Sequence, residues 1–154
     1  MNREILFRGK RVDNGEWVYG DLIQLHDGRK YIIDNKFGAC IDDKGNFINT
    51  KSQFVNEVIQ ETVSQYTGLT DKNGKKIFEG DIVQWSNIKM EIFWGEHIGI
   101  GYGFCWRPYG EEQSYHESMT GFIDEYEVIG NIFDEKEWLD ESKRYNKRRY
   151  YILS

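Results

Sequence analysis

The stretch that most constrains the fold is residues 61–85, ETVSQYTGLTDKNGKKIFEGDIVQW. Asp71-Lys72-Asn73-Gly74 is a turn signal, because Asn and Gly tolerate positive φ and Asp accepts hydrogen bonds from amides further along its own turn. Apolar and β-branched residues lie on both sides of these four residues. The stretch therefore predicts a strand, a tight turn and a second strand, with Gly68 as a further left-handed or close-approach position.

A second conformational signal follows at Glu79-Gly80-Asp81. A Gly-Asp pair inside an apolar, β-rich run is typical of a bend or bulge. Two interpretations of Asp81 are open: it is a general base or metal ligand, or its carboxyl group caps the amides of the turn. We favour the turn cap, because short acidic side chains at bends commonly accept hydrogen bonds from nearby backbone amides.

The chain resembles the YopX family in patches spread over most of its length. Residues 3–9, 61–83 and 128–132 carry the likeness, whereas residues 25–57 and 86–120 carry little of it. The central match is specific, because many residue types recur there at fixed spacing. Its structural signature comprises Gly68, Asp71, Gly74, Gly80, Asp81 and Gly130.

The resemblance to YopX proteins carries expectations about fold and origin. It implies a mainly β, antiparallel fold that contains a small barrel of the Src-homology-3 type. It also implies a protein encoded by a phage or prophage, in a family with no established activity. What residues 25–57 and 86–120 do does not follow from the resemblance.

We expect three segments along the chain. Residues 1–60 form an N-terminal antiparallel β region, residues 61–133 form the small barrel, and residues 134–154 form a C-terminal helix with a basic tail; alternatively, all three make one compact unit. The helix is predicted because acidic residues open it, basic residues close it, and Trp138 and Leu139 begin an apolar stripe along one side.

Residues 14–23 and 73–83 share a pattern of an Asn-Gly turn, an apolar pair, a Gly-Asp pair and a second apolar pair. One interpretation is a duplicated strand-bend-strand unit that makes two related halves. The other is that any turn-strand-bend-strand sequence looks like this, which we favour because matches this short arise often.

The net charge of −6 argues against a general attraction to nucleic acid phosphates or anionic lipid. No apolar run approaches the roughly 20 residues of a membrane-spanning helix. The N-terminal stretch has no apolar core of signal-peptide length. We therefore expect a protein of the host bacterium's cytoplasm, where Cys40 and Cys105 remain free thiols.

The residues with catalytic or metal-binding chemistry form no recognisable constellation. The spacing of His97, Cys105 and His116 matches no zinc pattern. Residues 99–103, GIGYG, lack the third glycine and the following helix of a phosphate-binding loop. Neither cysteine has a neighbouring group that would activate a thiolate. We therefore expect no metal, no cofactor and no enzymatic activity.

Three classes of function are open, and the first is favoured. An interaction module would bind a phage or host protein, or its own copies, through exposed aromatic side chains. A nucleic-acid-binding accessory protein would add the basic tail, although the helix dipole alone explains cations there. An unrecognised enzyme is the third class. The candidate binding residues are Trp85, Trp94, Trp106, Tyr109, Lys147, Arg148 and Arg149.

Overall fold

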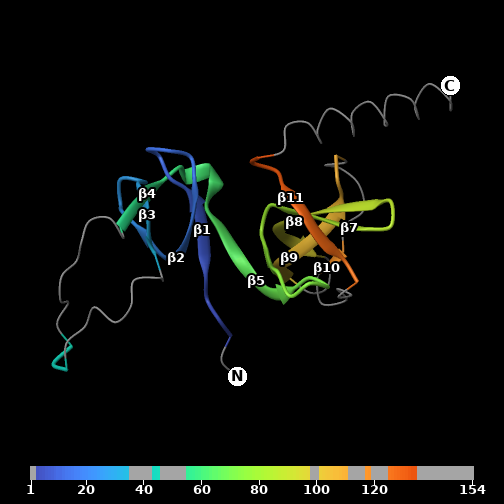
Figure 1. Ribbon diagram of the computed structural model, residues 1–154, viewed down its shortest axis with the longest axis horizontal. Coiled ribbons are helices and arrows are strands. Elements are labelled where there is room, and N and C mark those ends of the chain that lie inside the picture. The colour runs from blue at the N-terminus through green and yellow to red at the C-terminus, as the bar shows by residue number, and fades with distance from the viewer. Residues whose placement is uncertain are drawn as a thin grey trace. The chain divides into compact units, whose positions relative to one another are not determined.

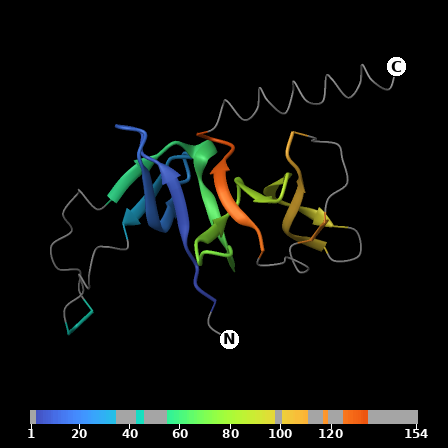
Figure 2. The same cartoon turned by 45° about the vertical axis from the view of Figure 1, so that its right-hand side comes forward.

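The computed structural model describes residues 3–34, 43–45, 55–97, 101–110, 117–118 and 125–134. The chain divides into two compact units, Met1–Gly68 and Leu69–Ser154, which we call unit 1 and unit 2. Both are built from antiparallel strands (Figures 1 and 2). The mainly β, antiparallel fold expected from the sequence is confirmed.

Unit 1 is a sheet with the strand order β4-β3-β2-β1-β5, in which all neighbours are antiparallel. Its core comprises Val18, Ile32 and Val58, one from each of three strands. These side chains share one face of the sheet, because directions alternate along a strand. The elements are β1 (Phe7–Lys10), β2 (Trp17–Gln24), β3 (Lys30–Asp34), β4 (Val55–Val58), the 3-10 helix η2 (Gln60–Thr62) and β5 (Ser64–Thr70).

The beginning of β5 belongs to unit 1 because it pairs with β1. The partners are Phe7 with Gln65 and Arg8 with Ser64. The units therefore divide after Gly68, whereas the sequence placed a boundary after residue 60. Gly68 itself lies within β5 at φ 88°, so the left-handed conformation expected there is present.

Unit 2 contains a five-stranded sheet with the order β10-β9-β8-β7-β11, while β6 pairs with β5. Its core is formed by Ile77, Val83, Ile92, Trp106 and Tyr126. Each comes from a different strand or strand end, so burial of these side chains holds the unit together. The elements are β6 (Lys76–Phe78), β7 (Asp81–Trp85), β8 (Ile88–His97), β9 (Gly101–Pro108), β10 (Glu117–Ser118) and β11 (Glu127–Asn131).

Two finer expectations about the fold are not supported. The five-stranded sheet ends at β10 and β11, and no pairing between them closes it into a barrel within the described ranges. Of the strands in residues 61–133, β5 and β6 pair with each other and belong to the sheet of β1–β4, not to the five-stranded sheet. The predicted C-terminal helix and basic tail cover residues 134–154, and all of these except Asp134 lie outside the described residues. Within the described part of the chain, no helix is long and apolar enough to cross a bilayer.

Candidate binding pocket

The turn predicted at residues 71–74 is present, and the buried side chain of Asp71 organises it. Its Oδ1 accepts hydrogen bonds from the amides of Asn73 at 2.8 Å and Lys75 at 2.9 Å. Its Oδ2 accepts one from the amide of Val128 in β11 at 3.0 Å. Gly74 has φ 78°, which an L-residue rarely adopts. The carboxyl group therefore caps its own turn and joins it to a strand far away in the sequence.

The ionisation of Asp71 follows from these contacts. Burial by itself would raise the pKa of Asp71, but the amides of Val128, Lys75 and Asn73, helped by the charge of Lys75, outweigh it. The net effect lowers the pKa below its usual value, because amide donors favour the charged form of a carboxyl group. Asp71 is therefore a carboxylate at neutral pH.

The same turn fixes the side chain of Glu127. The amide of Lys72 donates to the carbonyl of Tyr126 at 3.0 Å, while Asp71 holds Val128, so the backbone on each side of Glu127 is tied to the turn. The Glu127 carboxylate then receives Lys72 Nζ at 3.1 Å and Asn73 Nδ2 at 3.3 Å. The turn thus sets the position of one cation and one anion at the edge of β11.

The Glu79-Gly80-Asp81 bend is the second structural centre. Gly80 has φ 83°, its amide donates to the carbonyl of Ile92 at 2.7 Å, and its carbonyl accepts from the amide of Ile132 at 2.9 Å. Asp81 is 1% exposed, and its Oδ2 accepts from the amide of Phe78 at 2.8 Å. The prediction of a capping carboxyl group is confirmed, and its burial leaves Asp81 no access to a substrate.

The hairpin between β7 and β8 presents an indole ring to solvent. Trp85 is 47% exposed, yet its ring lies 6.3 Å from the ring of Tyr126, which belongs to the core. The next residue, Ser86, has φ 55°, an uncommon conformation for a residue with a Cβ. Gln84 Nε2 donates to the Ser86 carbonyl at 2.7 Å and spans the turn. A hydrogen bond therefore stabilises the hairpin tip, with Trp85 beside it.

An irregularity in β11 brings an apolar side chain to the same place. The register with β7 shifts between Val128 and Gly130, so Ile129 is the extra residue of a bulge. A bulge re-aims the side chain that it carries. Gly130 continues β11 beyond the bulge and pairs with Ile82.

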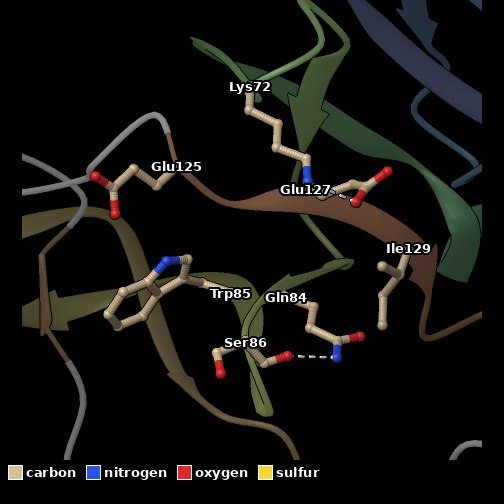
Figure 3. A pocket seen from close by; sticks show the side chains of 7 residues that line it. All are labelled: Lys72, Gln84, Trp85, Ser86, Glu125, Glu127 and Ile129. Carbon is tan, nitrogen blue, oxygen red and sulfur yellow. Dashed lines mark hydrogen bonds and ion pairs between the residues drawn. The ribbon is translucent and has the colours of Figure 1, made fainter.

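These elements surround a shallow pocket of about 280 Å³ (Figure 3). The Lys72–Glu127 ion pair lies on one side of it, and Gln84 and Ser86 lie on another. In this view the Trp85 ring and the Glu125 side chain lie on one side of the pocket, and Ile129 lies on the opposite side. The lining residues are Lys72, Gln84, Trp85, Ser86, Glu125, Glu127 and Ile129.

A protein-family model described as YopX protein matches residues 6–140. The chain belongs to the YopX family. Among solved structures, it is similar to that of protein EF1440 from Enterococcus faecalis, with 23% identity, a TM-score of 0.44, and coverage of 90% of this chain and 99% of that one. No curated protein matches the chain at a significant level. The matched range contains both signature turns and every residue that lines the pocket.

The aromatic candidates proposed from the sequence of this YopX family member divide into exposed and buried residues. Trp85 lines the pocket, whereas Trp94 is 50% exposed, lies outside it and packs edge-on against Phe104 at 4.9 Å. Trp106 and Tyr109 are only 6% and 8% exposed, so neither offers a surface for a partner. Trp106 is buried because it pairs with Ile92, a core residue in the middle of β8. Lys147, Arg148 and Arg149 lie outside the described residues.

Sequence reasoning missed most of the pocket. Glu125 and Glu127 were only two of many surface acids, and Ser86 had no motif around it. The one available signal was Trp85-Ser86-Asn87-Ile88, two residues between alternating strands with an aromatic residue at the turn. The pocket-lining residues that the sequence did not identify as a site are Lys72, Gln84, Ser86, Glu125, Glu127 and Ile129.

The other reactive side chains lie apart from this pocket. No group of three His, Cys, Asp or Glu side chains gathers into a metal site within the described ranges, and His116 and Cys40 fall outside them. Cys105 is a buried free thiol, and burial raises its pKa. A buried, protonated thiol is a poor nucleophile, so Cys105 acts here as a packing residue.

Proposed function

We propose that the protein is a binding module that takes up a short segment of a partner protein at the pocket beside Trp85. The observation that carries the proposal is the state of Trp85: its ring is anchored on the core through Tyr126 and is still about half exposed. Exposed aromatic side chains held in one position supply much of the binding energy at protein interfaces.

The size of the pocket supports a peptide side chain as the occupant. Its volume of about 280 Å³ falls just below the roughly 300–1,000 Å³ typical of pockets for small molecules. One long side chain would fill such a pocket while the rest of the segment lies across the β7–β8 hairpin. The proposed partner is a protein encoded by the host or by a phage.

Binding is proposed in place of catalysis because of how the signature acids are used. Asp71 and Asp81 are buried, and both accept hydrogen bonds from backbone amides. Both carboxyl groups therefore serve to stabilise the fold. The proposal needs no cofactor, and the likeness to YopX proteins supports a phage or prophage origin. The proposed place of action is the cytoplasm.

A yeast-displayed library of random peptides, selected against the purified full-length chain, tests the proposal. Peptides enriched on the wild-type protein are expected to lose at least about tenfold in affinity on Trp85→Ala, as expected for an interface hot spot. The matched control is Trp94→Ala, which removes another half-exposed indole of unit 2 that does not line the pocket. Affinities are measured by titration calorimetry on variants whose melting is cooperative.

Two outcomes of this selection would contradict the proposal. Peptides that bind Trp85→Ala as tightly as wild type, or that respond to Trp94→Ala instead, place the binding surface elsewhere and contradict the proposed site. A selection that enriches no peptide contradicts the proposal as a whole.

A further inference from the structure

We infer that the pocket is selective for an arginine side chain of the partner segment, an inference that rests on the proposed function. The guanidinium group would lie between the indole ring of Trp85 and the carboxylate of Glu125, which line the same pocket and lie on the same side of it in the view of Figure 3. The argument depends on which polar groups of the pocket already have partners and which do not.

The unused groups of the pocket are mostly hydrogen-bond acceptors. Glu125 is exposed and makes no hydrogen bond or ion pair with the part of the chain that the structure describes. Gln84 donates through Nε2 to the Ser86 carbonyl, which leaves its Oε1 as a further acceptor. A ligand that supplies several donors and a positive charge therefore matches the pocket, whereas an acidic ligand would face Glu125 and Glu127.

Arginine fits this arrangement better than lysine. A guanidinium is planar, so it can stack on the exposed face of Trp85 while its edge donates to a carboxylate. Its five N–H donors can reach two acceptors at once, Glu125 and the Oε1 of Gln84. A lysine ammonium offers a compact charge with no plane to stack, and it is more strongly hydrated.

Lys72 supplies an internal competitor for the same negative charge. Its Nζ lies 3.1 Å from Glu127, and both side chains are about half exposed. Exposed ion pairs of this kind are weak and readily exchanged. Lys72 thus neutralises part of the pocket in the free protein and opposes the entry of a second cation. Removing its charge should strengthen arginine binding, a response that a merely structural ion pair would not give.

The test is a titration followed by the indole N–H signal of Trp85 in nitrogen-15 NMR spectra, assigned with Trp85→Phe. The probes are three blocked tripeptides, glycine-X-glycine, in which X is arginine, lysine or glutamate. We expect a saturable shift with the arginine peptide, weaker binding of the lysine peptide and no shift with the glutamate peptide. Raising the salt concentration should weaken the arginine response, because salt screens exposed charges.

Three charge variants locate the effect. Glu125→Gln should weaken arginine binding about two- to fivefold, the range of one exposed ion pair, and Lys72→Met should strengthen it by a similar factor. The matched control is Glu57→Gln, which removes an exposed carboxylate in unit 1 and should change nothing. Glu125 makes no contact that folding needs, so its variant should melt like wild type.

The outcomes separate the inference from the proposed function. Equal responses to arginine and lysine, a response to glutamate, or unchanged affinity in Glu125→Gln would overturn arginine selectivity. If library peptides that depend on Trp85 contain no arginine, the pocket is still a binding site and only the inference fails. If no library peptide depends on Trp85, the proposed function fails first.

Discussion

Residues 14–23 in unit 1 and residues 73–83 in unit 2 have almost the same pattern of residue types, and they adopt different structures. The glycines of their turns agree in φ, 73° at Gly15 and 78° at Gly74. Their Gly-Asp pairs do not agree. Gly20 and Asp21 continue β2 without interruption, whereas Gly80 has φ 83° and ends the run before β7 begins.

The pairing partners explain this difference. Gly20 faces Phe7 of β1 on one side and Asp34 of β3 on the other, so ladders on both sides keep it extended. Gly80 instead donates to Ile92 and accepts from Ile132, which draws the chain into a bend. Asp21 is exposed and Asp81 is buried. The shared pattern therefore does not make a repeated strand-bend-strand unit.

The turns differ in how they are capped. Asp71 stands four residues before Lys75 and accepts its amide, whereas the corresponding position in unit 1 is Val12, which is exposed. There, Asn14 Oδ1 accepts from the amide of Glu16 at 2.9 Å. The backbone turns differ as well, because the Gly74 amide donates to the carbonyl of Asp71, three residues back, whereas the Gly15 amide donates to that of Arg11, four residues back. A buried carboxylate that reaches β11 caps the turn in unit 2, and a local side-chain contact caps the one in unit 1.

The largest contrast should come from the two aspartates of the Gly-Asp pairs. Asp81→Ala should destabilise the protein by about 2–3 kcal/mol, because it leaves the buried amide of Phe78 without its carboxyl acceptor. Asp21→Ala should change the free energy of unfolding by less than about 0.5 kcal/mol, as surface substitutions usually do. Urea denaturation measures both, and similar effects of the two would mean that the bends are alike after all.

The glycines should give a smaller but more specific contrast. A Cβ at Gly80 would lie 2.8 Å from the Phe133 ring in addition to the strain of φ 83°, so Gly80→Ala should cost roughly 1–3 kcal/mol. A Cβ at Gly15 or Gly74 would have no atom within 4 Å. Gly15→Ala and Gly74→Ala should therefore each lower the free energy of unfolding by only about 1 kcal/mol, because of the backbone conformation alone. Thermal unfolding measures the stability of the three variants. An equal loss of stability at all three glycines would contradict a steric contribution from Phe133.

The smallest effect concerns pH. The pKa of Asp71 is lowered in the folded state, so its stabilisation is full above the unfolded value near 3.9 and is lost as pH falls through the folded value. Stability of the wild type should therefore begin to fall below about pH 4. Asp71→Asn should be less stable than the wild type at neutral pH. Its stability should also fall less steeply as the pH is lowered. Hydrogen exchange of the Val128 amide follows the same contact locally, and unchanged pH dependence in Asp71→Asn would contradict the shift.

The turn conformations and the capping aspartates could be predicted from the sequence, because they depend on local chemistry. Positive φ at Gly74 and Gly80 follows from what glycine alone tolerates, and Asp71 and Asp81 are short acids placed where turn amides need acceptors. Strand alternation and the spacing of the signature likewise identify the antiparallel fold and the YopX family.

Tertiary structure decided the exposure of the tryptophans, the conformations of Gly20 and Gly80 and the composition of the pocket, because these depend on which strands lie side by side. Trp85 and Trp106 are the same residue type in similar strands, yet one is half exposed at a hairpin end and the other is buried opposite Ile92. Gly20 and Gly80 differ only through their partners. The pocket unites Lys72, Trp85 and Glu125, which stand far apart in the sequence, and only the contact of one turn with β11 brings them together.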